Sequence, residues 1–367
     1  MAISDLNELT EDEARDLLVR AGMAKLQQNK VMQALQQNKV MQALLSAPAA
    51  VVDKAAIATA DPAHKPPATV SLRVGSVAHR GMGFIRAFGS QGDDKGQFNH
   101  PIGVALDRDG NIVVSDYDNH RVQVFGFIDG KHMSSMGQSG SGNGQFDHPW
   151  GIALDGAGHL VVVEHGNDRV QVLNYADGSH VRTIGSQGSG NDRLFGPSGV
   201  AIDCDGNIVV HDGFNNGRIQ IFDIDGAHIR SICSRGSGPG QIDGYGGVAF
   251  DAEGNLVVAD SLNHRIQVLR YSDGAHLRTI GQEGSGNCQF SSPYGLALDG
   301  AGLLVVVELG NERVQVLNYA DGSHVRTIGR QGSDNGHFKV PCGGIAIDGD
   351  GHIIVSDCDN HRIQVLQ

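Results

Sequence analysis

A repeat of about 48 residues runs through most of this 367-residue sequence. The segment PIGVALDRDGNIVVSDYDNHRVQVF, which starts at Pro101, returns in related form from Pro149, Pro197, Tyr245, Pro293 and Pro341. The aspartates that close the first apolar run of successive copies are 48, 48, 48, 48 and 49 residues apart. Because a fixed period of this length means one structural unit per copy, the chain must fold as an array of six similar units.

Each copy contains short runs that are typical of β-strands. In the first copy GVALD, NIVVSD and RVQVF are rich in β-branched residues and are separated by turn residues. A fourth run, such as HVRTI at 180–184, follows a second Asp-Gly turn. Four strands per repeat is the size of a propeller blade, so the sequence predicts an all-β, six-bladed β-propeller of four-stranded blades. The 52 glycines agree with so many tight turns.

The last copy ends at Gln367, directly after its third strand. Residues 84–89, FIRAFG, match the fourth-strand pattern HVRTIG and precede the first glycine-rich connector. We therefore expect this N-terminal strand to pair with residues 362–366. Such pairing closes the ring and removes open sheet edges.

The residues before the repeats differ in composition. TEDE at 10–13 is typical of a capping box and predicts an α-helical segment that ends near residue 45. QQNKVMQAL occurs there twice, at 27–35 and 36–44, which indicates either a recent duplication or a helix that engages a second protein. The following stretch is rich in Ala, Pro and Val, as linkers are. The predicted domains are a helical segment at 1–45, a linker at 46–80 and the propeller at 81–367.

The consensus P-x-G-[VIL]-A-[LIF]-D, followed by [ND]-x-[IL]-V-V-x-D-x-x-N-x-R-[IV]-Q-V-[LF], resembles the NHL repeat over roughly residues 84–367. The resemblance includes the NHL domain of tripartite-motif proteins, and it implies RNA recognition or the recruitment of substrates to a ubiquitin ligase. Ligases of that family carry Cys/His-rich zinc modules, whereas no cysteine precedes Cys204 here. We therefore expect an adaptor or substrate receptor that does not itself transfer ubiquitin by that route.

An acidic residue and an arginine recur on either side of the turn between the second and third strands. We expect each pair to form a structural ion pair that holds this turn. The pairs are Asp116/Arg121, Glu164/Arg169, Asp212/Arg218, Asp260/Arg265, Glu308/Arg313 and Asp357/Arg362.

Motifs for catalysis, metals and cofactors are weak. Asp-x-Asp-Gly at Asp107, Asp203 and Asp348 lacks the other ligands of a calcium loop, and the glycine-rich connectors lack a P-loop lysine, so we expect flexible turns. The peptidyl-amidating lyase resembles this propeller but holds zinc through channel histidines, where the present sequence has glycines. Neither GxSxG nor HExxH occurs. We expect no enzymatic activity, no cofactor and no metal; a lyase-like propeller enzyme is the disfavoured alternative.

Topology predicts which face binds a partner. The connectors and the second-to-third-strand turns should emerge on one face and vary in sequence, whereas the two Asp-Gly turns of the other face are monotonous. Large aromatic residues with polar neighbours are typical interface anchors. Alternatively, Trp150 and Tyr294 merely plug the channel. The residues expected to bind a partner are Trp150, Tyr294, Ile102, Tyr117, His120, His165, Asn167, Phe214, His264 and His361.

Charge separates the two classes of partner. Residues 84–367 hold 19 lysines and arginines against 33 acidic residues, a net charge of −14. This charge disfavours phosphate binding, so we expect a protein or peptide on the propeller face, with RNA as the alternative. An acidic N-terminus, the lack of an 18-residue apolar run and five cysteines without a CxxC pair predict a cytoplasmic protein that binds no membrane.

Overall fold

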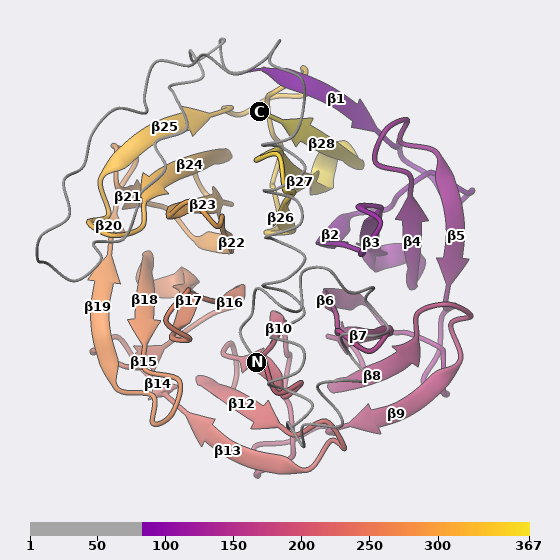
Figure 1. Ribbon diagram of the computed structural model, residues 1–367, viewed down its shortest axis with the longest axis horizontal. Coiled ribbons are helices and arrows are strands. Elements are labelled where there is room, and N and C mark those ends of the chain that lie inside the picture. The colour runs from indigo at the N-terminus through magenta and orange to yellow at the C-terminus, as the bar shows by residue number, and fades with distance from the viewer. Residues whose placement is uncertain (1–82) are drawn as a thin grey trace, which may run out of the picture. The chain divides into compact units, whose positions relative to one another are not determined.

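The computed structural model describes residues 83–367, which form an all-β, six-bladed propeller (Figure 1). Six four-stranded antiparallel sheets, called blades 1 to 6, surround a central channel. The predicted helical segment at 1–45 and linker at 46–80 lie outside the described residues. Between residues 83 and 367 the only helices are three short 3-10 turns, and none has the length and apolar character needed to span a bilayer.

The strands of each blade follow one another from the channel outward. Blade 1 consists of β2 (Pro101–Leu106), β3 (Ile112–Asp116), β4 (Arg121–Phe125) and β5 (His132–Met136). Blade 2 consists of β6 (Pro149–Leu154), β7 (His159–Glu164), β8 (Arg169–Asn174) and β9 (His180–Ile184). Blade 3 consists of β10 (Val200–Ile202), β11 (Ile208–Asp212), β12 (Arg218–Phe222) and β13 (His228–Ile232).

Blade 4 consists of β16 (Val248–Phe250), β17 (Leu256–Asp260), β18 (Arg265–Leu269) and β19 (His276–Ile280). Blade 5 consists of β22 (Pro293–Leu298), β23 (Leu303–Glu308), β24 (Arg313–Asn318) and β25 (His324–Ile328). Blade 6 consists of β26 (Ile345–Ile347), β27 (Ile353–Asp357), β28 (Arg362–Leu366) and β1 (Phe84–Phe88). The 3-10 turns are η1 (Tyr117–Asn119), η2 (Ser261–Asn263) and η3 (Cys358–Asn360).

Blade 6 closes the ring with a strand from the opposite end of the sequence. β1 pairs antiparallel with β28, and Phe84 lies opposite Leu366 while Phe88 lies opposite Ile363. In Figure 1 the indigo β1 lies beside the yellow β28, outside the other strands of that blade. The predicted closure is therefore confirmed, and β28 has no free edge.

The hydrophobic core lies between adjacent blades. Between blades 1 and 2, Val122 and Val124 of one sheet pack with Leu160 and Val162 of the next. β-Branched and leucine side chains fill these layers because both faces of each inner strand are buried. Each such layer also receives one apolar residue from the connector that links the two blades, and these residues are Phe98, Phe146, Leu194, Ile242, Phe290 and Phe338, all fully buried.

The glycine-rich connectors are ordered, contrary to the expectation of flexible turns. Between blades 1 and 2 the amide of Phe146 donates to the carbonyl of Gln138 (2.8 Å), and the amide of Gly140 donates back to the carbonyl of Phe146 (3.0 Å). Gly140 has a φ of +149°, and a Cβ there would collide with the side chain of Gln145. The glycines thus permit a fixed loop that inserts Phe146 into the core. Two other connectors form short parallel ladders, β14 (Ser234–Arg235) with β15 (Gln241–Ile242) and β20 (Gln282–Glu283) with β21 (Gln289–Phe290).

Candidate partner-binding face

Two faces of the propeller are built from different loops. The connectors meet the second-to-third-strand turns, since the amides of Tyr117 and Asp118 donate to the carbonyls of His100 and Asn99. We call this side the connector face. The Asp-Gly turns meet one another on the other side, where the amide of Tyr175 donates to the carbonyl of Gly158 (2.9 Å). The predicted sorting of loops between the faces is thus observed.

The structure brings the acid and the arginine of every repeated pair together. The carboxylates are fully buried, and their distances to the arginine Nε atoms range from 2.5 to 3.0 Å. Each arginine also binds the connector: the guanidinium of Arg169 donates to the carbonyls of Ser141, Gly142 and Gln145. The pair therefore fastens the connector to the blade as well as holding the turn.

A glutamine and an asparagine complete this network. Gln171 is fully buried and donates to Glu164 (2.8 Å) and to the carbonyl of Gln145 (2.7 Å). Asn167 donates to Glu164 (2.6 Å) and to the carbonyl of Gly140 (3.0 Å). The sequence analysis placed Asn167 among the partner-binding residues, but its amide is occupied within the blade. Hydrogen bonds of this kind offset only part of the cost of burial, which raises the pKa of the equivalent Asp116.

The channel is narrow because glycines line its wall. A cavity of about 550 Å³ is bounded by the inner strands, with Trp150, Tyr294, Ile102 and Cys342 among its lining residues. Most inner-strand glycines lie against the backbone of the next blade; a Cβ on Gly103 would collide with the carbonyl of Trp150. Residues with side chains would widen the ring, so glycine here serves close packing of the inner strands.

One histidine is buried behind the channel wall. His211 of β11 is fully buried, and its Nδ1 lies 3.2 Å from the hydroxyl of Ser198. Burial lowers the pKa of His211 to about 4. The imidazole is therefore neutral at pH 7 and belongs to the packing of blade 3.

Aromatic rings from five blades gather at the channel mouth on the connector face. Trp150 stacks on Tyr245 with a centroid distance of 5.0 Å, and Tyr245 stacks on Phe214 at 4.3 Å. Tyr117 meets Trp150 edge-on at 5.6 Å. We call the set the aromatic cluster; it comprises Tyr117, Trp150, His165, Phe214, Tyr245 and Tyr294, each partly exposed.

Tyr245 is the hub of this cluster, and the sequence analysis missed it. Its ring contacts Trp150, Phe214, His165 (5.4 Å) and Tyr294 (6.2 Å). The signal in the sequence was the departure of the fourth copy from the leading proline of the other five. Tyr245 was interpreted only as a substitute for that proline.

The aromatic cluster is uncharged at neutral pH. Burial lowers the pKa of His165, so its imidazole is neutral. Burial also raises the pKa of Tyr117 to about 12 and shifts that of Tyr294 upward, so both phenols keep their protons. A neutral, partly exposed set of large rings is the surface chemistry expected of an interface anchor.

Comparison with known families agrees with the repeat pattern. The NHL repeat matches residues 98–125, 146–173, 196–222, 246–269 and 342–366. The chain belongs to the NHL-repeat family. Blade 5 lies outside the matched segments, yet its strands and its Glu308–Arg313 pair follow the same pattern as those of the other NHL blades.

Relatives with curated functions match over a short stretch only. The E3 ubiquitin-protein ligase TRIM71 of Rattus norvegicus is 46% identical over 41 residues, which are 11% of this chain and 5% of that protein. TRIM71 of Bos taurus is 51% identical over 39 residues, which are 11% of this chain and 4% of that protein. The NHL chain therefore matches about a twentieth of the length of these relatives.

Solved structures share the propeller fold. A protein of unknown function from Bacteroides thetaiotaomicron superposes with a TM-score of 0.59 and 18% identity, covering 78% of this chain and 76% of its own. The virginiamycin B lyase of Staphylococcus aureus superposes with a TM-score of 0.51 and 12% identity, covering 77% of this chain and 98% of its own. At such identities the likeness shows the fold alone.

Three of the predicted partner-binding histidines join neighbouring NHL blades. His120, His264 and His361 end the 3-10 turns in the left-handed conformation, and their Nδ1 atoms accept the amides of His148 (3.2 Å), Ser292 (3.1 Å) and His100 (3.2 Å). Asp168 and Glu312 accept the amides of Gly196 and Val340 in the same way. We call these contacts inter-blade staples; the histidines that form them are not free side chains awaiting a partner.

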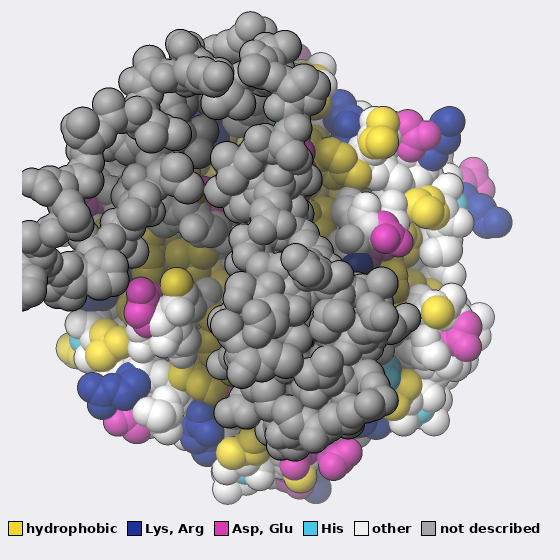
Figure 2. All heavy atoms as spheres, in the orientation of Figure 1, with side chains coloured by type: hydrophobic (Ala, Val, Ile, Leu, Met, Phe, Trp, Pro, Cys, Tyr) yellow, Lys and Arg dark blue, Asp and Glu magenta, His cyan; other side chains and the backbone are white. Residues whose placement is uncertain are grey.

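The remaining predicted residues divide by exposure. Ile102 is only 4% exposed and supports the channel wall from below. Trp150, Tyr294, Tyr117, His165 and Phe214 converge in the aromatic cluster. On the face visible in Figure 2, basic, acidic and hydrophobic side chains are interspersed around the rim and do not segregate by sign.

Proposed function

We propose that this NHL propeller is a non-enzymatic scaffold whose aromatic cluster binds a protein or peptide segment. The observation that carries the proposal is the convergence of six partly exposed rings from five blades on the connector face. Rigid rings lose little conformational entropy on binding, and they dominate the energetics of many interfaces. The glycines at the inner-strand positions, where a lyase would carry histidines, support a binding role over catalysis.

Charge favours a protein over RNA as the partner. The connectors and the second-to-third-strand turns carry eleven acidic residues against five lysines and arginines. Those five are Lys95, Arg193, Arg235, Arg330 and Lys339, and two of them already pair with Asp243 and Asp359. Since phosphate contacts need unpaired cations, a segment with apolar and basic side chains fits this face better than RNA does.

The likeness to TRIM71 supports a finer proposal. The bound protein would be a substrate or component of a ubiquitin-ligase pathway, with this chain acting as adaptor or substrate receptor. The five unpaired cysteines support action in a reducing compartment such as the cytoplasm.

The test is an affinity capture from cell lysate with the wild-type chain and the Trp150→Ala and Tyr245→Ala variants, each with and without RNase. The matched control is Ile224→Ala, which removes an exposed apolar side chain from an Asp-Gly turn on the other face. Protein partners that resist RNase and disappear only in the cluster variants support the proposal. Partners retained by both cluster variants, or RNA lost with them, would overturn it.

A further inference from the structure

A row of alternating imidazoles and carboxylates crosses the connector face from blade 6 to blade 2. Its consecutive contacts measure 3.5, 2.6, 3.6, 2.8 and 3.5 Å between ring nitrogens and carboxylate oxygens. In order, the row consists of Asp359, His100, Asp118, His148, Asp147 and His120.

The row contains more carboxylate contacts than neutral imidazoles can satisfy. His148 directs Nδ1 at Asp147 and Nε2 at Asp118, so both ring nitrogens face carboxylate oxygens. A neutral imidazole carries a single N–H, which leaves a lone pair facing the second carboxylate. A bound cation would turn that repulsion into attraction.

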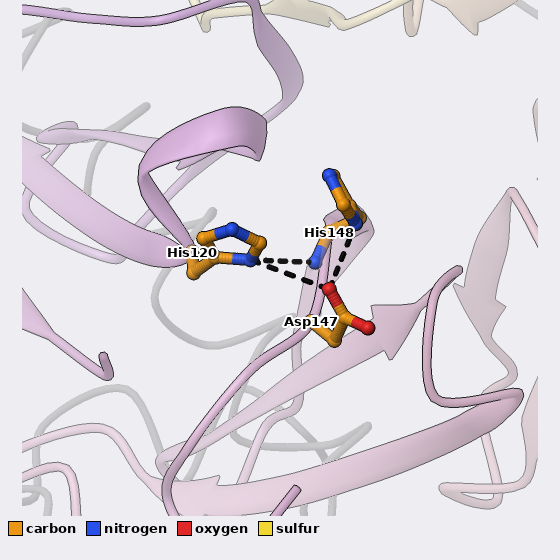
Figure 3. Close-up of side chains that lie close together, drawn as sticks. All are labelled: His120, Asp147 and His148. Atoms are coloured by element: carbon orange, nitrogen blue, oxygen red, sulfur yellow. Dashed lines mark hydrogen bonds and ion pairs between the residues drawn. The ribbon is translucent and has the colours of Figure 1, made fainter. Parts of the chain in front are cut away.

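Three donor atoms at the blade 2 end converge on one point. His120 Nδ1, Asp147 Oδ1 and His148 Nδ1 all lie within 4.8 Å of one another, as Figure 3 shows. Asp147 Oδ1 lies 3.5 Å from the first nitrogen and 2.8 Å from the second. Donor atoms around tetrahedral zinc lie about 3.3 Å apart when the bonds are 2.0–2.1 Å long, so shifts of roughly half an ångström would suffice.

The backbone around these donors is fixed. Asp147 is held because its amide donates to the buried Glu164 (3.0 Å), and His148 packs on the ring of Tyr117 at 4.5 Å. Asp118 lies on the far side of the His148 ring, in the position of a carboxylate that orients a metal-bound histidine. The three side chains are between 22% and 37% exposed, so an ion could reach them.

The other five blade junctions lack this combination of residues. The positions of His120, Asp147 and His148 are occupied elsewhere by Asp168, Phe195 and Gly196; by Gly217, Asp243 and Gly244; by His264, Ser291 and Ser292; by Glu312, Lys339 and Val340; and by His361, Asn99 and His100. The repeat framework therefore requires only the inter-blade staple. The additional acid and histidine at this one junction call for another explanation.

We propose that His120, Asp147 and His148 bind a transition-metal dication such as Zn²⁺, with the remaining coordination position open to solvent beside Tyr117. Two imidazoles and one carboxylate suit such an ion better than Ca²⁺ or Mg²⁺, which prefer oxygen ligands. Binding uses the lone pair of His120 Nδ1, so the amide of His148 gives up its bond to that atom. The proposal does not depend on the aromatic cluster binding a protein.

The experiment is titration of the full, chelator-treated chain with Zn²⁺ by calorimetry, and with Co²⁺ by visible absorption. We expect one tight equivalent and the absorption of a tetrahedral Co²⁺ site in the wild type. Asp147→Asn and His148→Ala should each weaken binding by roughly 100-fold or more, because each removes a ligand. Mg²⁺ should not compete.

The matched control is His264→Ala, which removes a staple of the same geometry at a junction without the acid. It should bind Zn²⁺ as the wild type does. Asp147→Asn replaces the acid by the residue found at the equivalent position 99, so it provides a folded variant if His148→Ala is unstable. Zn²⁺ binding that is absent in the wild type, unchanged in Asp147→Asn, or lost equally in His264→Ala would overturn the proposal.

Discussion

Removal of Arg169 is the sharpest test of how the NHL blades are held together. Arg169→Ala leaves Glu164 fully buried without its cation and frees the carbonyls of Ser141, Gly142 and Gln145. Breaking a buried ion pair by removing one partner typically costs about 3–5 kcal/mol. For a domain of this size, that loss corresponds to a fall in Tm of roughly 5–8 °C.

The control for this prediction is another arginine in an ion pair. Arg270 lies 3.0 Å from Asp273, but both side chains are 53% exposed. Arg270→Ala should therefore change the free energy of unfolding by only about 0–1 kcal/mol. Urea unfolding, followed by far-UV circular dichroism and by the fluorescence of Trp150, the one tryptophan, measures both variants.

A third variant separates charge from hydrogen bonding. Glu164→Gln combined with Arg169→Met removes both charges, and it should be more stable than Arg169→Ala because no buried carboxylate is left uncompensated. If Arg169→Ala were no more destabilising than Arg270→Ala, the buried pairs would not hold the connectors, and our account of the blade would be wrong.

Three further predictions follow from the same structure. Deletion of residues 84–88 should lower Tm by more than Arg169→Ala does, because it exposes the edge of β28; an unchanged melting curve would reject ring closure. The buried His211 has a pKa of about 4, against about 6.5 in an unfolded chain, so its protonation favours unfolding: the stabilisation is complete above pH 6.5 and is lost, by about 3 kcal/mol, as the pH falls to 4. His211→Val, which copies positions 163 and 307, should flatten this part of the stability profile, and an identical slope would contradict the assignment. Trp150→Ala should abolish partner binding while leaving Tm within about 2 °C of the wild type, and a collapse of Tm would instead show that the ring is a channel plug.

The architecture was predictable because the same pattern occurs six times. One copy alone contains short strands and turns that many β folds share, whereas a constant period fixes the number of blades. The match of FIRAFG to the fourth-strand pattern identified β1, and its pairing with β28 is local to one blade. Features that repeat within a blade could therefore be predicted from the sequence.

Features that depend on contacts between blades were harder to predict. Tyr245 became the hub of the aromatic cluster because five blades direct their rings to one point, which a linear pattern does not encode. The staple histidines look like exposed turn residues until the left-handed backbone turns Nδ1 towards the next blade. Glycine suggested flexibility in the connectors, whereas the buried Phe146 and the guanidinium of Arg169 hold one of them in place.

The central claim is that the connector face binds a protein through the aromatic cluster. A photoreactive benzoylphenylalanine at Phe214, compared with the same group at Ile224 on the other face, tests it most directly when crosslinked adducts are analysed after RNase treatment. Our account predicts protein adducts at position 214 that disappear with Trp150→Ala, and few at position 224. Equal protein adducts at both positions, or adducts at 214 that consist only of RNA, would contradict it.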